Sequence, residues 1–289
     1  MGHRDSVAGN RQGMGMDGMT ELGGERVGAE VIRAQGPADL VRINEGRVNI
    51  ATQAELIRRV IADAKLHRSG AVFTLNLDHL VKLREDARFR TAYDAAAYVS
   101  ADGAPVVSIA GRQGHAVDRV TGADLVVPLC EAAAAAGVSI HLFGTSDVIR
   151  DAAAEKLLAD IPGLVIAGSE SPPRGFDPEG EAAQAAAERI AASGAGICFI
   201  ALGAPKQELF AHAAVERSTG VMFICIGAAL DFISGHSKRA PAIFQSTGTE
   251  WVWRFLQEPR RLGMRYARSM AYYLGYLIKG PNKRFDKRG

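Results

Sequence analysis

Asp102 is the residue of this sequence with the best claim to act as a general base. It follows the apolar segment Tyr98-Val-Ser-Ala101 and precedes Gly103-Ala-Pro105. A carboxylate beside Gly and Pro is also a common turn residue, and the dipeptide alone favours that interpretation. Thr74 and Asn76, however, end a neighbouring apolar segment and offer a hydroxyl and an amide suited to sugar hydroxyls. In this company Asp102 becomes a candidate catalytic base.

Two junctions between an apolar run and a helical segment carry glycine at the turn. They are Gly203-Ala-Pro-Lys-Gln207-Glu208 and Gly144-Thr-Ser-Asp147. Such turns leave backbone N–H groups free to meet a phosphate or sugar oxygen, although plain connecting loops have the same composition. Gly144, Gly203 and Gln207 are therefore candidate substrate-binding residues. Neither junction has the glycine pattern of a dinucleotide site or a P-loop.

The C-terminal part of the chain is basic. Residues 238–289 hold 12 Lys and Arg against 3 Asp and Glu, whereas the whole chain of 289 residues has a net charge of +2. Guanidinium groups suit the oxygens of a diphosphate, and basic side chains also rest on anionic lipid; both roles stay open, and some of these charges simply face solvent. Nucleic acid is not an expected partner, because the rest of the chain is acidic and no known binding module is present.

Neither a metal nor a cofactor is expected. No D-x-D sequence, by which many nucleotide-sugar enzymes hold a divalent ion, occurs in the chain, and the histidines show no metal-ligand spacing. Arginines would then neutralise a leaving diphosphate. Cys130, Cys198 and Cys225 lie in apolar stretches without C-x-x-C spacing, which indicates buried thiols in a reducing compartment.

Apolar runs alternate with Ala-rich helical segments along most of the chain. The expected strands are 48–50, 71–75, 106–109, 139–143, 164–167, 197–202 and 221–226. The expected helices are 52–65, with Thr52 as the cap, and 123–136, 147–158, 179–192 and 206–216. This alternation predicts an α/β fold with a doubly wound, mostly parallel, Rossmann-like sheet. Ligands of such sheets bind beyond the carboxyl ends of the strands, so the polar motifs should share one cleft.

Three regions are expected: a flexible leader (1–40), the α/β core (41–235) and a C-terminal helical, basic appendage (236–289). The leader has no apolar segment typical of a secretory signal, and no stretch reaches the ~20 apolar residues of a membrane span, so we expect a cytoplasmic protein. The appendage should contain an amphipathic helix from Pro259 to about Ile278. One stripe of that helix is apolar (Leu262, Tyr266, Met270, Tyr273, Leu277) and another is basic (Arg261, Arg265, Arg268).

Taken in order, seven motifs resemble the WecG/TagA/CpsF glycosyltransferases, glycosyltransferase family 26. The motifs are Thr74-Leu-Asn76, Ala101-Asp-Gly-Ala-Pro105, Arg119-Val-Thr-Gly-Ala-Asp-Leu125, Leu202-Gly-Ala-Pro-Lys-Gln-Glu208, the 227–232 segment, Lys238-Arg-Ala-Pro241, and Glu250-Trp-Val-Trp-Arg254 with Glu258-Pro-Arg260. Together they cover about residues 45–265. The long segment before Leu40 departs from family members that begin near the first strand.

The resemblance implies inverting, metal-independent transfer of a sugar from a UDP-sugar to a saccharide on a polyprenyl diphosphate, in bacterial surface or exopolysaccharide synthesis. It implies an enzyme that is peripheral on the inner face of the cytoplasmic membrane. The donor sugar stays open among N-acetylmannosamine, its uronic acid, glucose and others, as do the acceptor saccharide and the oligomeric state, a homo-oligomer included.

The resemblance also carries residue roles. By position, Asp102 matches the family's proposed general base, Thr74 and Asn76 its cleft residues, and Gln207 a residue placed to contact substrate. The matching appendage arginines, which would engage the UDP diphosphate, are Arg254, Arg261 and, by a looser match, Arg265.

Two other functions are compatible with the same sequence. A Rossmann-like, nucleotide-binding oxidoreductase fits the alternating pattern but lacks the glycine fingerprint. A non-catalytic, membrane-docked subunit of a polysaccharide assembly fits the basic helix but leaves Asp102, Gln207 and the junction loops unexplained.

Overall fold

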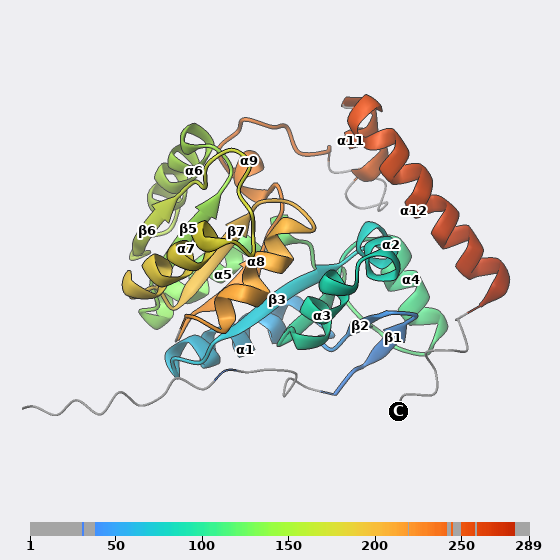
Figure 1. Cartoon of the computed structure of the whole chain (residues 1–289), viewed down its shortest axis with the longest axis horizontal. Helices are drawn as coiled ribbons and strands as arrows, with labels where there is room; N and C mark the ends of the chain where they lie inside the picture. Colours follow the sequence, from blue (N-terminus) through green and yellow to red (C-terminus); the bar gives the residue numbers. More distant parts are fainter. Residues whose placement is uncertain are drawn as a thin grey trace, which may run out of the picture.

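The computed structural model describes Val31 and residues 38–218, 220–241, 244, 250–257 and 259–280. Its centre is a six-stranded parallel sheet of order β4-β3-β8-β7-β5-β6 (Figure 1). The strands are β3 (Gly70–Leu75), β4 (Tyr98–Ala101), β5 (Ile140–Gly144), β6 (Ile166–Glu170), β7 (Ile197–Ala201) and β8 (Met222–Cys225). The predicted doubly wound α/β fold is therefore confirmed.

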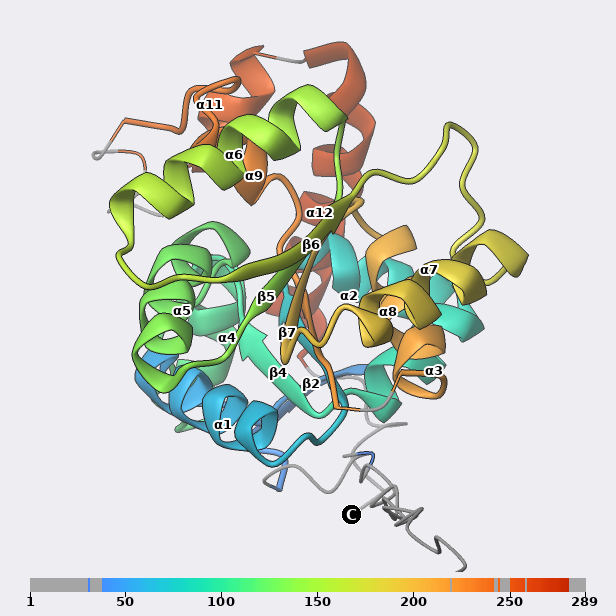
Figure 2. The same ribbon diagram turned by 90° about the vertical axis from the view of Figure 1, so that its left-hand side faces the viewer.

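Helices cover both faces of this sheet, as Figure 2 shows. One face carries α2 (Leu77–Glu85), α3 (Ala87–Ala95), α4 (Ala104–Arg112), α7 (Glu181–Ala192) and α8 (Lys206–Val215). The other carries α1 (Gln53–Lys65), α5 (Gly122–Ala136), α6 (Asp147–Asp160) and α9 (Ala229–Ile233). Successive side chains of a strand enter opposite layers: Phe223 packs in the first and Ile224 in the second. This two-sided burial explains why the strands are apolar throughout.

Most predicted elements are present, with ends shifted by a few residues. Thr52 caps α1, because its side chain accepts a hydrogen bond from the Glu55 N–H. The predicted strand at 48–50 is wrong in its bounds: β2 is Gly46–Val48, and it pairs antiparallel with β1 (Val41–Ile43) in a separate two-stranded sheet. All three cysteines are buried and free, as predicted.

The expected strand at 106–109 is wrong, because these residues form the middle of α4. Val106, Ile109 and Ala110 are buried, which is the spacing of one helical face and not of a strand. Pro105 in the first turn starts the helix. The strand at this place in the fold is β4, directly before Asp102. A short apolar run has the same composition in a buried helix and in a buried strand, so composition alone could not distinguish the two here.

The C-terminal region forms α11 (Glu250–Gln257) and α12 (Pro259–Lys279), and α12 runs along α2 (Figure 1). The Tyr272 hydroxyl accepts a hydrogen bond from the Asn44 side chain, and the Tyr276 hydroxyl accepts one from Gln113 Nε2 at 3.0 Å. These contacts fix which side of α12 faces the core. Among the α12 side chains that the structure describes, Leu262, Ser269, Tyr272 and Tyr276 are buried. Leu262 belongs to the predicted apolar stripe, whereas the other members of that stripe are only half-buried, and Tyr266 packs against Phe255 of α11.

Two predictions about the chain ends have different outcomes. The expected leader lies outside the described residues, apart from Val31 and residues 38–40, so its flexibility stays a prediction. Within the part of the chain that the structure describes, no helix is long and apolar enough to cross a membrane.

Candidate active site

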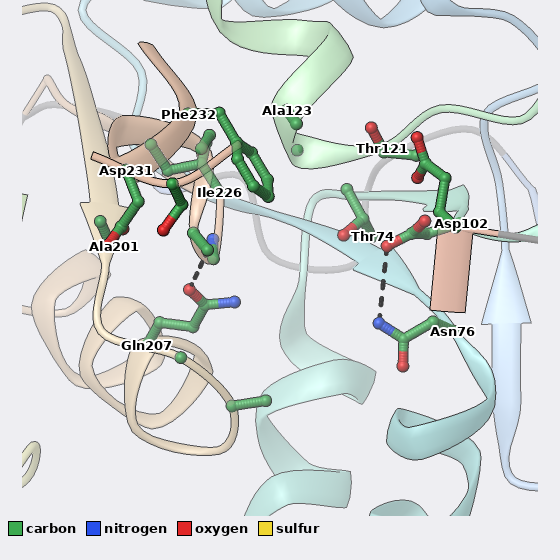
Figure 3. Close-up of a pocket in the computed structure, with 18 of the residues that line it drawn as sticks. Thr74, Asn76, Asp102, Thr121, Ala123, Ala201, Gln207, Ile226, Asp231 and Phe232 are labelled. Carbon is green, nitrogen blue, oxygen red and sulfur yellow. Dashed lines mark hydrogen bonds between the residues drawn. The ribbon is translucent and has the colours of Figure 1, made fainter. Parts of the chain in front are cut away.

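A cleft of about 430 Å³ lies at the carboxyl edge of the sheet. The ends of β3, β4, β7 and β8 and the first turns of α2, α5, α8 and α9 form its floor (Figure 3). Residues from the C-terminal region close one side. Its predicted members are Thr74, Asn76, Asp102, Gly203, Gln207 and Arg265. These six residues line the same cleft, and their roles in binding and catalysis stay predictions.

Asp102 is half-buried at the end of β4, and its backbone N–H donates to the Leu75 carbonyl at 2.8 Å. Gly103, which follows, has a φ of 92°, a conformation that favours glycine and turns the chain into α4. Burial raises the pKa of the Asp102 carboxyl from 3.8 to about 7, a hydrogen bond from Asn76 opposes this shift, and the charge of Glu250 adds to it. A carboxyl with this pKa is a serviceable base at neutral pH.

Asn76 connects the cap of a helix to the base. Its Oδ1 accepts from the His79 N–H at 3.0 Å, which caps α2, and its Nδ2 donates to Asp102 Oδ2 at 3.5 Å (Figure 3). The cap fixes the orientation of the amide, so the donor is held toward the carboxylate. Thr74 pairs in register with Ser100 across β3 and β4 and lines the same wall.

Gln207 lies on the opposite side of the cleft from Asp102 (Figure 3). It is in the first turn of α8, after the Gly203-Ala-Pro205 turn, and its Oε1 accepts from the Gly227 N–H at 3.0 Å. The cleft therefore lies between Asp102 and Asn76 on one side and Gln207 and Asp231 on the other (Figure 3).

Arg265 of α12 reaches into the cleft from the side of the appendage. Its Nε lies 3.9 Å from Asp78 Oδ2 and is buried without a hydrogen-bond partner among the described residues. The guanidinium group is thus held near the strand ends with donor capacity to spare, which suits an anionic ligand.

A cluster of four charged side chains joins the appendage to the core beside Asp102. Glu250, at the start of α11, lies 3.6 Å from Arg119 and 3.6 Å from Arg239. Both arginines also contact Asp124, whose Oδ2 accepts from Thr121 Oγ1 at 2.8 Å. This ion-pair network holds the entry to the C-terminal helices against the cleft.

Three predicted residues are not brought into this cleft by what the structure describes. Gly144 lies outside the cleft lining: its φ is 119°, and a Cβ there would meet the Ala201 carbonyl oxygen at 2.5 Å. The close packing of β5 on β7 therefore explains why position 144 is a glycine, and contact of Gly144 with substrate stays a prediction. The side chains of Arg254 and Arg261 lie outside the described part of the structure.

The family model for the glycosyl transferase WecG/TagA/CpsF family matches residues 41–286. The chain belongs to this family. The match begins at β1 and includes the core and both C-terminal helices, so these parts of the glycosyltransferase belong to one family unit. Glycosyl transfer in cell-surface polysaccharide synthesis is accordingly its general activity.

Several cleft residues of the glycosyltransferase had no role assigned from sequence. They are Asp78, His79, Thr121, Asp231, Phe232 and Glu250. Thr121, Asp231, Phe232 and Glu250 fall inside the motifs that carry the family resemblance. Asp78 and His79 follow Asn76 in the first turn of α2. The signal that could have found them is position, since the first turn of a helix after a parallel strand faces the ligand side.

No group of three or more His, Cys, Asp or Glu among the described residues is arranged to hold a metal ion. Metal independence of the reaction stays a prediction.

Proposed function

We propose that the glycosyltransferase moves a sugar from a UDP-sugar to a saccharide carried on a polyprenyl diphosphate, with inversion at the anomeric carbon. The observation that carries this proposal is the shared cleft of Asp102 and Arg265. One supplies a base for the acceptor hydroxyl and the other a fixed cation for the departing diphosphate. The sugar moiety of the donor and the saccharide acceptor are left unspecified.

The reaction would proceed as a single displacement. An acceptor hydroxyl gives its proton to Asp102 while its oxygen bonds to the anomeric carbon, and the bond to UDP breaks with its electron pair leaving on the diphosphate. Positioned general bases contribute typically ~10²- to 10⁴-fold to such rates. Arg265, with Arg254 and Arg261 as further candidates, would stabilise the charge that develops on the diphosphate.

The pH dependence of the rate should report the protonation of Asp102. Because the carboxylate is the active form and its pKa is about 7, kcat/KM should rise with pH and level off above neutrality. Asn76→Ser keeps a good helix cap but removes the amide donor that lowers this pKa. We expect the acid limb of the profile to move to higher pH in this variant, with little change in Tm. An unmoved limb would argue against Asp102 as the titrating base.

The outer face of α12 carries exposed apolar and basic side chains that are suited to binding a membrane. Met264, Leu274 and Ile278 are exposed by 74%, 50% and 83%, and Arg260 is exposed near them. Large apolar side chains flanked by arginine are typical of helices that lie in the headgroup region of anionic bilayers. We therefore propose that α12 places the cleft beside the lipid-linked acceptor.

Vesicle binding tests this surface. The double substitution Met264→Glu with Ile278→Glu should weaken binding to phosphatidylglycerol vesicles, measured by co-sedimentation, by roughly tenfold or more per residue. This is the effect expected when an apolar side chain that the bilayer would bury is lost. The matched control is Val148→Glu on α6, a residue that is 78% exposed. Equal losses in both variants, or none in either, would contradict the assignment.

A ligand comparison separates this function from its competitors. UDP at a hundredfold excess over its Kd should raise Tm by roughly 5–10 °C, whereas NAD should not. UDP release from a panel of UDP-sugars with a short prenyl-diphosphate acceptor would then distinguish an enzyme from a docked subunit. Stabilisation by NAD instead of UDP would favour the oxidoreductase, and UDP binding without turnover would favour the subunit.

A further inference from the structure

Glu208 is a fully buried carboxyl directly behind the cleft, and the mechanism above does not use it. Its exposed fraction is 0%, and its Oε2 has no hydrogen-bond partner among the described residues. Burial raises the pKa of this carboxyl from 4.5 to about 7. A buried carboxyl with only one of its two oxygens hydrogen-bonded lowers the stability of the fold. Its presence therefore suggests a role other than stability.

The nearest basic group in the described structure does not neutralise it. His79 Nε2 lies 3.8 Å from Glu208 Oε1, but burial lowers the pKa of His79 to about 3, so the imidazole is neutral. Its Nδ1 is 2.6 Å from the Tyr93 hydroxyl, whose own pKa burial raises. Tyr93 therefore keeps its proton and stays neutral, and Lys82, Asp78 and Arg265 act only from farther away. Ion pairing does not account for Glu208.

Besides the N–H of its own backbone, the Glu208 carboxyl contacts the cleft amide. Gln207 Nε2 donates to Glu208 Oε1 at 2.7 Å, while Gln207 Oε1 accepts from the Gly227 N–H. Flipping the amide would place its NH₂ against the Gly227 donor and its oxygen against the Glu208 oxygen. The two partners therefore specify the same orientation, and they leave one Nε2 hydrogen for a ligand.

We propose that Glu208 is a positioning residue that locks the Gln207 amide, so that its remaining N–H points to a hydrogen-bond acceptor on the substrate. With only the Gly227 contact, the amide could rotate about its last side-chain bond. The second contact removes that freedom. This proposal deepens the proposed function and rests on it, since a sugar or phosphate oxygen would be the acceptor.

A double-mutant cycle on kcat/KM tests whether Glu208 acts through Gln207. Gln207→Ala and Glu208→Leu should each lower kcat/KM on the order of tenfold, the effect of one lost hydrogen bond. The kcat/KM of the double variant should be no lower than that of the less active single variant, because the second change removes a contact that is already lost. Losses that multiply, or a fully active Glu208→Leu enzyme, would overturn the proposal.

A conservative variant supplies the control. Glu208→Gln keeps an oxygen for Gln207 Nε2 and should retain kcat/KM within about threefold. Tm of Glu208→Leu should equal or exceed that of the unchanged chain, because an apolar side chain replaces a poorly paired buried carboxyl. A Glu208→Gln enzyme as slow as Glu208→Leu would contradict the positioning role, since its acceptor oxygen is intact.

A measurement on the unchanged protein covers the case in which Glu208→Leu does not fold. In the NMR spectrum, the Nε2 hydrogen of Gln207 that faces Glu208, assigned by its loss in Gln207→Ala, should exchange with solvent more slowly than the second Nε2 hydrogen. Two Nε2 hydrogens that exchange equally fast would refute the lock. This readout needs no substrate, so it remains decisive even if UDP-sugar transfer fails, whereas an inactive unchanged chain would count against the proposed function alone.

Discussion

Asp102→Asn is expected to lower kcat by roughly 10²- to 10⁴-fold while leaving the Kd for UDP close to its original value. The asparagine keeps the shape of the side chain but cannot take a proton from the acceptor hydroxyl. Asp102 is not among the residues proposed to bind the diphosphate, so its replacement by the isosteric asparagine should leave UDP binding intact. Calorimetric titration with UDP and a UDP-release assay measure the two quantities.

The stability of this variant gives a second check. In the folded chain the pKa of Asp102 is raised from 3.8 to about 7, so the fold binds its proton more tightly than the unfolded chain does. Stability attributable to this group therefore falls as pH rises from about 4 to 7 and stays low above that. Asp102→Asn removes this penalty, and its Tm at pH 8 should equal or exceed the original.

Asp160→Asn is a suitable control, because Asp160 ends α6 and pairs with Lys156 at 2.9 Å, away from the cleft. It should have unchanged kcat. Parallel loss of UDP binding and transfer in Asp102→Asn would indicate a structural carboxylate instead of a base.

Arg265→Ala is expected to lower kcat by roughly 10²- to 10³-fold, the typical effect of removing one fixed donor from a developing anion. UDP should also bind more weakly, because the guanidinium lines the cleft beside Asp78 and its Nε has no hydrogen-bond partner among the described residues. Arg265→Lys should recover part of the loss, since lysine keeps the charge without the planar fork. Steady-state kinetics with a saturating acceptor, together with UDP titration, measure both effects.

Arg268 is the matched control on the same helix. It is exposed and pairs with Glu85 at 2.6 Å outside the cleft. Arg268→Ala should have unchanged kcat and Kd for UDP. Similar losses in both variants would mean that α12 acts only through its bulk charge.

The fold followed from sequence because its strands are buried on both faces and its helices carry recognisable caps, as at Thr52. The error at 106–109 arose because a run of four mostly apolar residues does not reveal whether its period is two or 3.6. The buried face of α12 also differs from the predicted apolar stripe, apart from Leu262. Which face of that helix docks depends on the Tyr272 and Tyr276 hydroxyls meeting Asn44 and Gln113, partners more than 150 positions away in the chain.

The site divides in the same way. Asp102, Thr74, Asn76 and Gln207 could be found because strand ends and helix starts concentrate ligand-facing residues. Glu208 could not, since its neighbour Gln207 faces the cleft while the carboxyl itself turns into the core, a distinction that depends on the packing of α8 against α3 and β8. The pKa of Asp102 was likewise invisible, because burial sets it.

The most direct test of the account is a crystal structure of the chain with UDP bound. We expect the diphosphate at the carboxyl edge of the sheet, within reach of Arg265, with Asp102 facing the open side where the anomeric carbon of a donor would lie. UDP bound at another surface, or a diphosphate that contacts no residue of α11 or α12, would contradict the assignment of this cleft as the transfer site.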